Sequence, residues 1–184
     1  MSKRVAWSLA AAAAIAVAIA AAVVVRDPQR HGENNAAATR STPSSMGFSN
    51  YVNVRFAYSL CYPPQLLLPQ GESADGDGQK FVSSDTQVTA IVYGSNNVLG
   101  QTLQQVLDQD SQGVSVNNKS IDANAFTFNG TQKTLTVIEK TFLQDQVFKT
   151  LNIQFPTTMA PTYASIAQRM IACFANTSPT QYSQ

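Results

Sequence analysis

The chain has 184 residues, a length that suits one domain once the terminal segments are set aside. Charged residues make up 12% of the sequence, against a usual share of roughly 25%. The formal net charge is +1 and no basic patch with interleaved aromatic residues occurs, so the sequence lacks the electrostatic footprint of a nucleic-acid-binding protein.

The N-terminus carries an apolar segment of the kind that directs export. Residues 5–25 contain no charge, Lys3 and Arg4 precede them, and Arg26 follows them. Positive residues before an apolar run are typical of an export signal and place the N-terminus in the cytoplasm. At a rise of about 1.5 Å per residue, a helix of this length spans roughly one hydrocarbon core.

The C-terminal part of this segment bears on whether it is cleaved. Ala20-Ala21-Ala22 fits a small-residue cleavage site, but the apolar run continues through Val23-Val24-Val25. The pattern favours an uncleaved anchor helix over residues 1–26, with a cleaved signal peptide as the alternative. We therefore expect the rest of the chain on the periplasmic side of the inner membrane, or in the periplasm if the segment is cleaved.

Residues 27–47 are dominated by Pro, Gly, Asn, Ser, Thr and Ala. Such a segment cannot bury enough apolar surface to offset the entropy lost on ordering, so a flexible linker is predicted. His31, the only histidine of the chain, lies in it. An exported domain is predicted over residues 48–178 and a loose tail over residues 179–184.

The first part of this domain has the pattern of strands. Residues 51–63 are rich in aromatic and β-branched side chains and predict one or two strands, stopped by two prolines. A short apolar segment follows at 66–69. Strands are predicted at 79–84 and 88–94, joined by a turn.

Helical periodicity then alternates with a second set of strands. Leu99, Leu103, Val106 and Leu107 predict a helix near 100–111. The following strands contain two turn signals, Asn129-Gly130 and Gln144-Asp145-Gln146. Pro161 opens a last helix. Its predicted buried stripe consists of Tyr163, Ile166, Ala167, Met170 and Phe174.

The order of these elements predicts the fold class. Hairpin-type links without regular β-α-β alternation argue against a doubly wound parallel sheet. We expect an α+β fold, in which an antiparallel β-sheet packs with helices, preceded by the N-terminal hydrophobic helix.

One stretch also resembles a known superfamily. "AYSLCYPPQLLLP" (57–69) is similar to the opening of PsbP/Mog1-like proteins, where an aromatic-rich strand ends in Tyr-Pro before a short apolar segment. "GDGQ-F" and "YGSNN" resemble stretches of small exported bacterial proteins. The resemblance covers roughly 48–175 and implies a binding or assembly module, as in photosystem subunits and some immunity proteins against secreted toxins. It carries over no catalytic residue.

The chain has two cysteines, Cys61 and Cys173. An even number in an oxidising compartment favours a disulfide between them, with two free buried thiols as the alternative. A bond would tie both ends of the domain together. The absence of CxxC argues against a redox enzyme, and two cysteines without a histidine in the domain cannot complete a structural zinc site.

The stretch "QGESADGDGQKF" (70–81) concentrates three of the chain's 11 acidic residues, Glu72, Asp75 and Asp77. Aligned with an EF-hand loop it places Ser84 where a bidentate Glu is needed, so that calcium motif fails. The three carboxylates remain candidates for a looser metal site. Its glycines and aspartates favour a surface turn that presents negative charge to a partner.

Catalytic motifs are not found, and we assign no catalytic or cofactor-binding residue. The sequence has no GxSxG, HExxH, SxxK or P-loop, and His31 lies in the linker. Glu139 and Lys140 are adjacent on a predicted strand and point to opposite faces, which indicates a solvated residue and a packed stem rather than a catalytic pair. A hydrolase with paired carboxylates stays open.

We therefore expect a non-enzymatic, membrane-tethered periplasmic module that binds another protein and no nucleic acid. A narrower form is a toxin-neutralising immunity protein or an envelope assembly protein. The alternatives are a carboxylate-dependent envelope hydrolase, which needs two close carboxylates in a deep pocket, and a small-ligand binding module, which needs an apolar cavity.

Because the apolar run extends to Val25, the full-length protein should stay in the membrane fraction. Fractionation followed by N-terminal analysis of the recovered protein checks this. A soluble mature form that starts near Val23 or later would contradict it.

Overall fold

The computed structural model describes residues 46–176, so the predicted anchor, nearly all of the predicted linker and the predicted tail lie outside the described residues. Every strand pairing is antiparallel within the described part, and two α-helices accompany the sheets. The α+β prediction is therefore confirmed. No helix within residues 46–176 has the length and hydropathy needed to cross a membrane.

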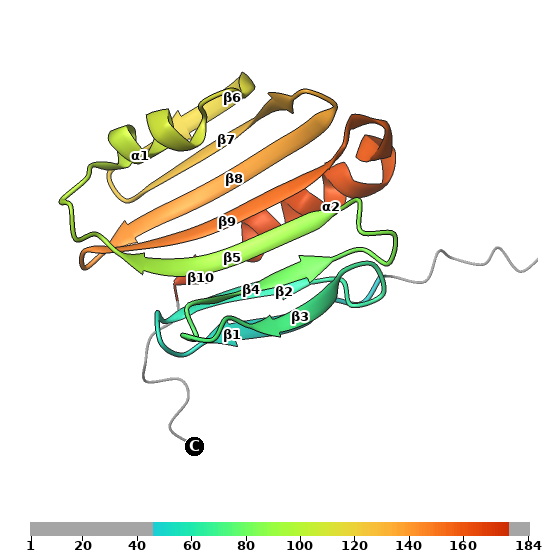
Figure 1. Cartoon of the computed structure of the whole chain (residues 1–184), viewed down its shortest axis with the longest axis horizontal. Coiled ribbons are helices and arrows are strands. Elements are labelled where there is room, and N and C mark those ends of the chain that lie inside the picture. The colour runs from blue at the N-terminus through green and yellow to red at the C-terminus, as the bar shows by residue number, and fades with distance from the viewer. Residues whose placement is uncertain (1–45, 177–184) are drawn as a thin grey trace, which may run out of the picture. The chain divides into compact units, whose positions relative to one another are not determined.

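Seven strands form the main sheet in the order β3-β4-β5-β9-β8-β7-β6 (Figure 1). They are β3 (Leu68–Glu72), β4 (Gly78–Val82), β5 (Thr89–Asn96), β6 (Ser115–Ile121), β7 (Ala125–Gln132), β8 (Leu135–Gln144) and β9 (Val147–Pro156). A smaller sheet has the order β1-β2-β10, with β1 (Ser49–Asn53), β2 (Tyr58–Tyr62) and β10 (Ala175–Asn176). The helices are α1 (Leu103–Asp110) and α2 (Ala160–Cys173), the latter preceded by the short 3₁₀ turn η1 (Thr157–Met159).

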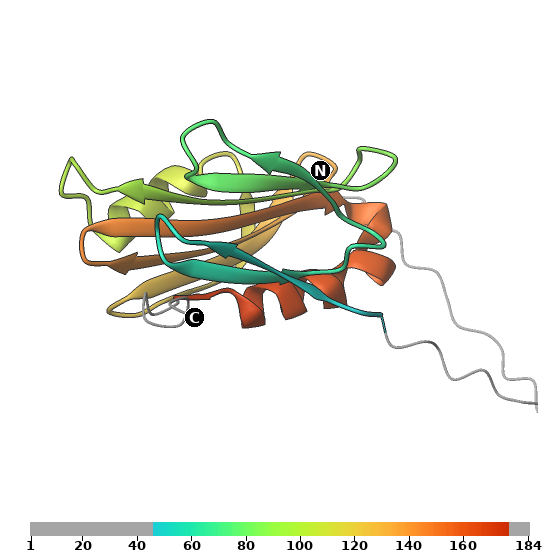
Figure 2. The same ribbon diagram turned by 90° about the horizontal axis from the view of Figure 1, so that it is seen from below.

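The main sheet is covered on both faces. Helix α2 and the small sheet lie against one face, and α1 lies on the other (Figures 1 and 2). Strand β9 contributes Leu151 and Ile153 to the core shared with α2, and Phe148 to the core beneath α1. Odd and even residues of a strand point to opposite faces, so this one strand serves both cores.

Helix α2 has the predicted start and the predicted buried face. Pro161 lies in its first turn, where a missing N–H costs nothing. Its C-terminal end is capped from the sheet, because the Lys140 ammonium donates to the carbonyls of Ile171 (3.1 Å) and Phe174 (3.2 Å). The predicted stripe of Tyr163, Ile166, Ala167, Met170 and Phe174 is buried.

Helix α1 is shorter than predicted and begins at a capping box. The Thr102 side chain accepts a hydrogen bond from the Gln105 amide, and the Gln105 side chain accepts one from the Thr102 amide. Leu103 and Leu107 are buried as predicted, whereas Leu99 lies before the helix and is 79% exposed.

One predicted turn is wrong and the other is confirmed. Asn129 and Gly130 lie inside β7, and the chain reverses after Gln132 instead. Gly130 is needed for close approach, because a Cβ there would lie 2.5 Å from the Ser115 carbonyl and 2.6 Å from the Val114 side chain. The second turn lies between β8 and β9, where Asp145 and Gln146 have φ angles of 51° and 61°.

Two strands were absent from the sequence prediction. The apolar segment predicted at 66–69 runs into β3, whose five residues are all exposed and include Pro69 and Gly71. Strand β10 has only two residues. Neither segment shows the alternation of buried and exposed residues on which a strand prediction depends.

A disulfide joins Cys61 in β2 to Cys173, the last residue of α2, with the two Cα atoms 5.9 Å apart. The predicted pairing is confirmed. The bond links residues 112 positions apart and fastens the small sheet to the helix beside it.

Replacing both cysteines, with Cys61→Ala and Cys173→Ala, should lower the free energy of unfolding. The chain-entropy model gives an upper value of about 4–5 kcal/mol for a loop of this length. Urea unfolding of the oxidised wild type and the double variant measures the loss. Adding reductant should lower the unfolding midpoint of the wild type only. Equal unfolding midpoints in oxidising buffer would contradict a stabilising bond.

Candidate functional site

The acidic stretch forms a tight turn between β3 and β4, as predicted. Ser73 organises it: its amide donates to the Gly78 carbonyl (2.9 Å), and its Oγ accepts from the amides of Asp77 (3.0 Å) and Gly78 (3.3 Å). The Ser73 hydroxyl in turn donates to the Asp77 carboxylate. We call residues 73–77 the acidic turn.

Side chains from the small sheet and its β1–β2 connection hold the acidic turn in place through hydrogen bonds. Asn53, only 1% exposed, donates from Nδ2 to the Gly76 carbonyl (2.9 Å). The Arg55 guanidinium donates to the Asp75 carbonyl. The Tyr58 hydroxyl donates to the Asp77 carbonyl (2.9 Å), and burial raises the pKa of Tyr58, so this donor stays protonated. The acidic turn is therefore held in one conformation by three side chains of the small sheet and its β1–β2 connection.

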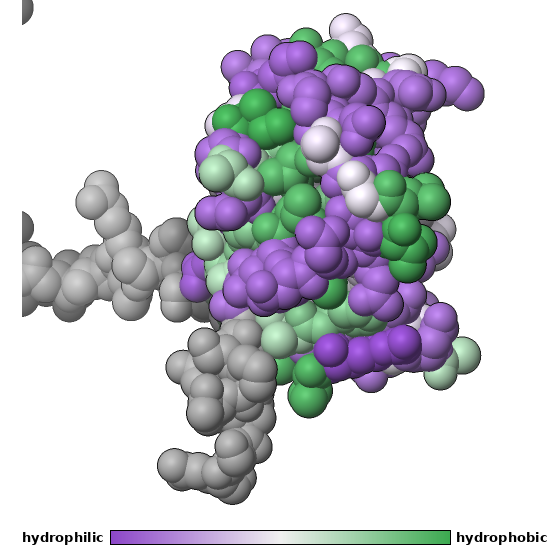
Figure 3. Space-filling view, turned by 90° about the vertical axis from the view of Figure 1, so that its left-hand side faces the viewer, coloured by the Kyte–Doolittle hydropathy of each residue, from purple (hydrophilic) through white to green (hydrophobic). Residues whose placement is uncertain are grey.

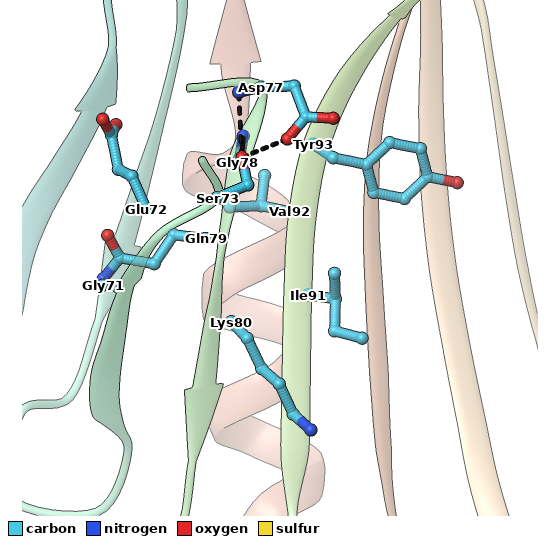
Figure 4. Close-up of a pocket in the computed structure, with 10 residues that line it drawn as sticks. All are labelled: Gly71, Glu72, Ser73, Asp77, Gly78, Gln79, Lys80, Ile91, Val92 and Tyr93. Atoms are coloured by element: carbon cyan, nitrogen blue, oxygen red, sulfur yellow. Dashed lines mark hydrogen bonds between the residues drawn. The ribbon is translucent and has the colours of Figure 1, made fainter. Parts of the chain in front are cut away.

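The three acidic side chains do not converge. Glu72 accepts from the Tyr51 hydroxyl (2.8 Å), Asp77 accepts from Ser73, and Asp75 is exposed. In Figure 4 the Glu72 and Asp77 carboxylates point away from each other. Within residues 46–176, no group of three or more His, Cys, Asp and Glu side chains is placed to hold a metal ion.

A shallow hollow of about 330 Å³ borders the acidic turn (Figure 4). It is lined by β3, the end of the turn, β4 and β5. Lys80 and Ile91 are cross-strand partners along it, and Gly78 is paired with Tyr93. A Cβ at Gly78 would overlap the Val92 carbonyl and the Tyr93 backbone, so glycine allows this close approach.

Exposed apolar side chains lie at the same end of the molecule. Val98 and Leu99, in the loop between β5 and α1, are 85% and 79% exposed, and Val54, between β1 and β2, is 74% exposed. Figure 3 looks onto this end and shows hydrophobic residues set among hydrophilic ones. An apolar side chain left in water gains free energy when a partner covers it.

The β5–α1 loop is braced by Asn97. The Asn97 side chain donates to the Gln101 carbonyl (2.9 Å) and accepts from the Gln101 amide (2.8 Å), and its amide donates to the Gln146 carbonyl (2.7 Å). Gly100 has a φ of 62°, which closes the loop. Val98 and Leu99 are therefore presented on an ordered support.

The acidic turn and these apolar residues share one end of the sheet, which we call the loop end: residues 54–57, 73–77 and 97–102. The Gly94 amide donates to the Asp77 carbonyl (2.8 Å), and the ring of Phe56 lies against Gly94. In Figure 1 the loop end is on the left, whereas the described chain begins on the right.

A second group of polar side chains lies beneath α1. Glu139 is 4% exposed, and its Oε2 accepts from Asn152 Nδ2 (2.7 Å), whereas its Oε1 has no hydrogen-bond partner. The Asp110 side chain, from the end of α1, lies within hydrogen-bonding reach of Glu139. Burial raises the pKa of Glu139 to about 8 and also raises the pKa of Asp110.

The sequence-based interpretation of Glu139 and Lys140 is therefore wrong in part. The two residues do point to opposite faces, but Glu139 is buried and Lys140 is half-buried against the end of α2. Sequence reasoning also missed Asp110 as the partner of Glu139, because the two residues lie on elements whose contact depends on the fold. Two close carboxyls are present, but the hollow of Figure 4 is lined by neither.

Calcium in millimolar excess should leave the melting temperature of the protein unchanged, because the three carboxylates of the stretch do not face a common point. A site occupied at about 100 times its dissociation constant would add roughly 2.7 kcal/mol of stability, a shift of several degrees. Melting in calcium and in chelator at equal ionic strength tests this. A rise that disappears with Asp75→Asn and Asp77→Asn would show that the stretch binds the ion.

Comparison with known proteins supports the fold. No family model matches the chain, and no curated protein matches it. Among solved structures, the chain is similar to cyanobacterial PsbP (CyanoP) from Synechocystis sp. PCC 6803, with a TM-score of 0.52 and 13% sequence identity. The match covers 73% of this chain and 95% of that one. The described domain therefore has the PsbP-like fold that the stretch at 57–69 indicated.

Proposed function

We propose that this chain is a non-enzymatic, membrane-tethered protein of the cell envelope that binds another protein at its loop end. The observation that carries the proposal is the pair Val98 and Leu99, 85% and 79% exposed on a loop that Asn97 braces. Exposed apolar side chains that adjoin one another, as these two do, are what mark a protein interaction site, whereas single ones do not.

Energetics favour this end as a docking surface. Covering one Val or Leu side chain contributes roughly 1.5–3 kcal/mol. Ordering a loop on binding costs free energy, and the hydrogen bonds of Asn97 hold this loop before any partner arrives. The loop end therefore needs little reorganisation to bind.

The acidic turn gives this surface a preference for charge. Asp75 is exposed, while its backbone carbonyl accepts from Arg55, so the main chain beneath the side chain is fixed. Charges at the rim of an interface act mainly on the rate of association and on the choice of partner. We infer a partner with an apolar pocket flanked by Lys or Arg.

The position of the chain's N-terminal side suits tethering. The apolar run 5–25 is followed by a linker predicted up to residue 47, and the described chain starts at the end opposite to the loop end (Figure 1). A tether that joins the domain at residue 46 therefore does not join it at the loop end. An immunity protein or an envelope assembly protein is the narrower form of this proposal.

Photo-crosslinking in cells tests the docking surface. A photoreactive residue in place of Val98 should give a discrete crosslinked partner in the membrane fraction, identified by mass spectrometry. The same residue in place of Ile121, which is 42% exposed on β6, should not.

Leu99→Asp should then reduce capture of that partner by tenfold or more, since about 1.4 kcal/mol of lost contact suffices. Ile121→Asp is the matched control and should leave capture unchanged. Equal crosslinking from both sites, or full capture of the partner by Leu99→Asp, would contradict a docking surface at the loop end.

A further inference from the structure

Helix α1 has the construction of a lid. It is eight residues long and packs through Leu103 and Leu107 onto Phe126 and Phe128 of β7 and Phe148 of β9. Helices this short are marginal without tertiary packing. Glycines with positive φ lie on both sides of it, Gly100 at 62° and Gly113 at 74°, and a Cβ at Gly100 would meet no atom within 4 Å.

The buried carboxyl group beneath this helix lacks one partner. Glu139 Oε2 accepts from Asn152, and the Asn152 side chain is itself held by Gln154 Nε2 (2.9 Å). Glu139 Oε1 is buried and unpartnered, although buried polar atoms are normally hydrogen-bonded. The group within its reach is the Asp110 carboxyl, which is an acceptor when ionised.

A proton removes this conflict. Two carboxylates in contact cannot both be ionised at low cost, whereas one carboxylic acid donates to one carboxylate. Asp110 is also the last residue of α1, where the helix dipole disfavours negative charge, and the last turn carries no basic residue. The geometry therefore needs a hydrogen shared between the Glu139 and Asp110 carboxyl groups.

We propose that α1 is a proton-gated lid: one proton shared between Asp110 and Glu139 holds the helix closed over Phe126 and Phe128, and loss of that proton releases it. The hinge is the segment around Gly113, because the Asn97 hydrogen bonds keep the Gly100 side fixed. Release uncovers the apolar residues beneath α1 on this face of the main sheet.

Among the described residues, no positively charged side chain acts on Glu139. From α1 it faces Asp110; from β9, the neutral Asn152; from β7, its cross-strand partner Phe128. Tyr93 on β5 lies near enough for Glu139 to act on its pKa, which burial raises, so its hydroxyl stays neutral. Among the described side chains, those that act on the pKa of Glu139 include no cation.

The sign of the pH dependence follows from these contacts. The closed lid holds the proton up to the raised pKa of Glu139, about 8, whereas a released Glu139 loses it near the ordinary value of 4.5. The closed state is therefore favoured most below pH 4.5. The equilibrium constant for closing falls by up to about tenfold per pH unit as the pH rises toward 8. Above pH 8 this constant no longer changes with pH.

Hydrogen exchange of the full-length chain measures the lid directly. Protection factors of the α1 amides, corrected for the intrinsic effect of pH, should fall between pH 6 and pH 8 and level off by pH 9. Those of α2 should stay constant over the same range. Opening of one element while another stays protected is the signature of local release.

Three variants separate the shared proton from general effects of charge. Glu139→Gln puts an amide donor where the proton lies, so α1 should keep its pH 6 protection at pH 9. Asp110→Asn lets the new amide donate to the Glu139 carboxylate and should flatten the pH dependence too, which keeps the test usable if Glu139→Gln does not fold. Asp108→Asn changes an exposed carboxylate of the same helix and should retain the wild-type fall.

Three results would overturn the proposal. The first is wild-type protection of α1 that does not change between pH 6 and pH 9. The second is a fall in protection that persists in both Glu139→Gln and Asp110→Asn. The third is a fall in protection that Asp108→Asn removes as well as these two variants do.

Discussion

The structure depends on one strand that must satisfy two cores at once. Strand β9 is the middle strand of the main sheet, with β5 on one side and β8 on the other. Leu151 and Ile153 are buried on the α2 side, while Phe148 and Thr150 are buried on the α1 side. A slip of one residue would exchange these two sets, so the register of the sheet is specified from both faces. The positions of α1, α2 and the small sheet all follow from this register.

The two faces are secured by different chemistry. On the α2 side, the Cys61–Cys173 disulfide and the hydrogen bonds of Lys140 fasten the helix at its C-terminal end. On the α1 side, the helix is held by apolar contacts and by a carboxyl pair that needs a proton. One face is thus covalently fixed and the other can respond to the solvent, within a single domain.

Elements were predicted well from the sequence where buried residues recur at the regular spacing of a helix or a strand. The stripe of α2, the strands around 79–84 and 88–94, and the turn at Gln144-Asp145-Gln146 were all found from local patterns. Strand β3 was not, because an exposed edge strand with Pro69 and Gly71 has no such period. The turn predicted at Asn129-Gly130 was wrong, because Gly130 allows β6 to approach β7 closely and does not form a turn. The partner of Glu139 depends on a contact between distant elements, which no local pattern encodes.

The direction of β1 has a mechanical consequence. The described chain enters β1 at one end of the domain, and the strand leads to the β1–β2 connection at the loop end (Figure 1). A load between residue 46 and a partner on the loop end therefore pulls along the strand axis. The backbone hydrogen bonds that pair Ser49–Asn53 with Tyr58–Tyr62 would bear that load together, in shear, rather than opening one after another. Behind them, the disulfide at Cys61 would pass the force into α2, so such a load would be shared between the small sheet and the helix.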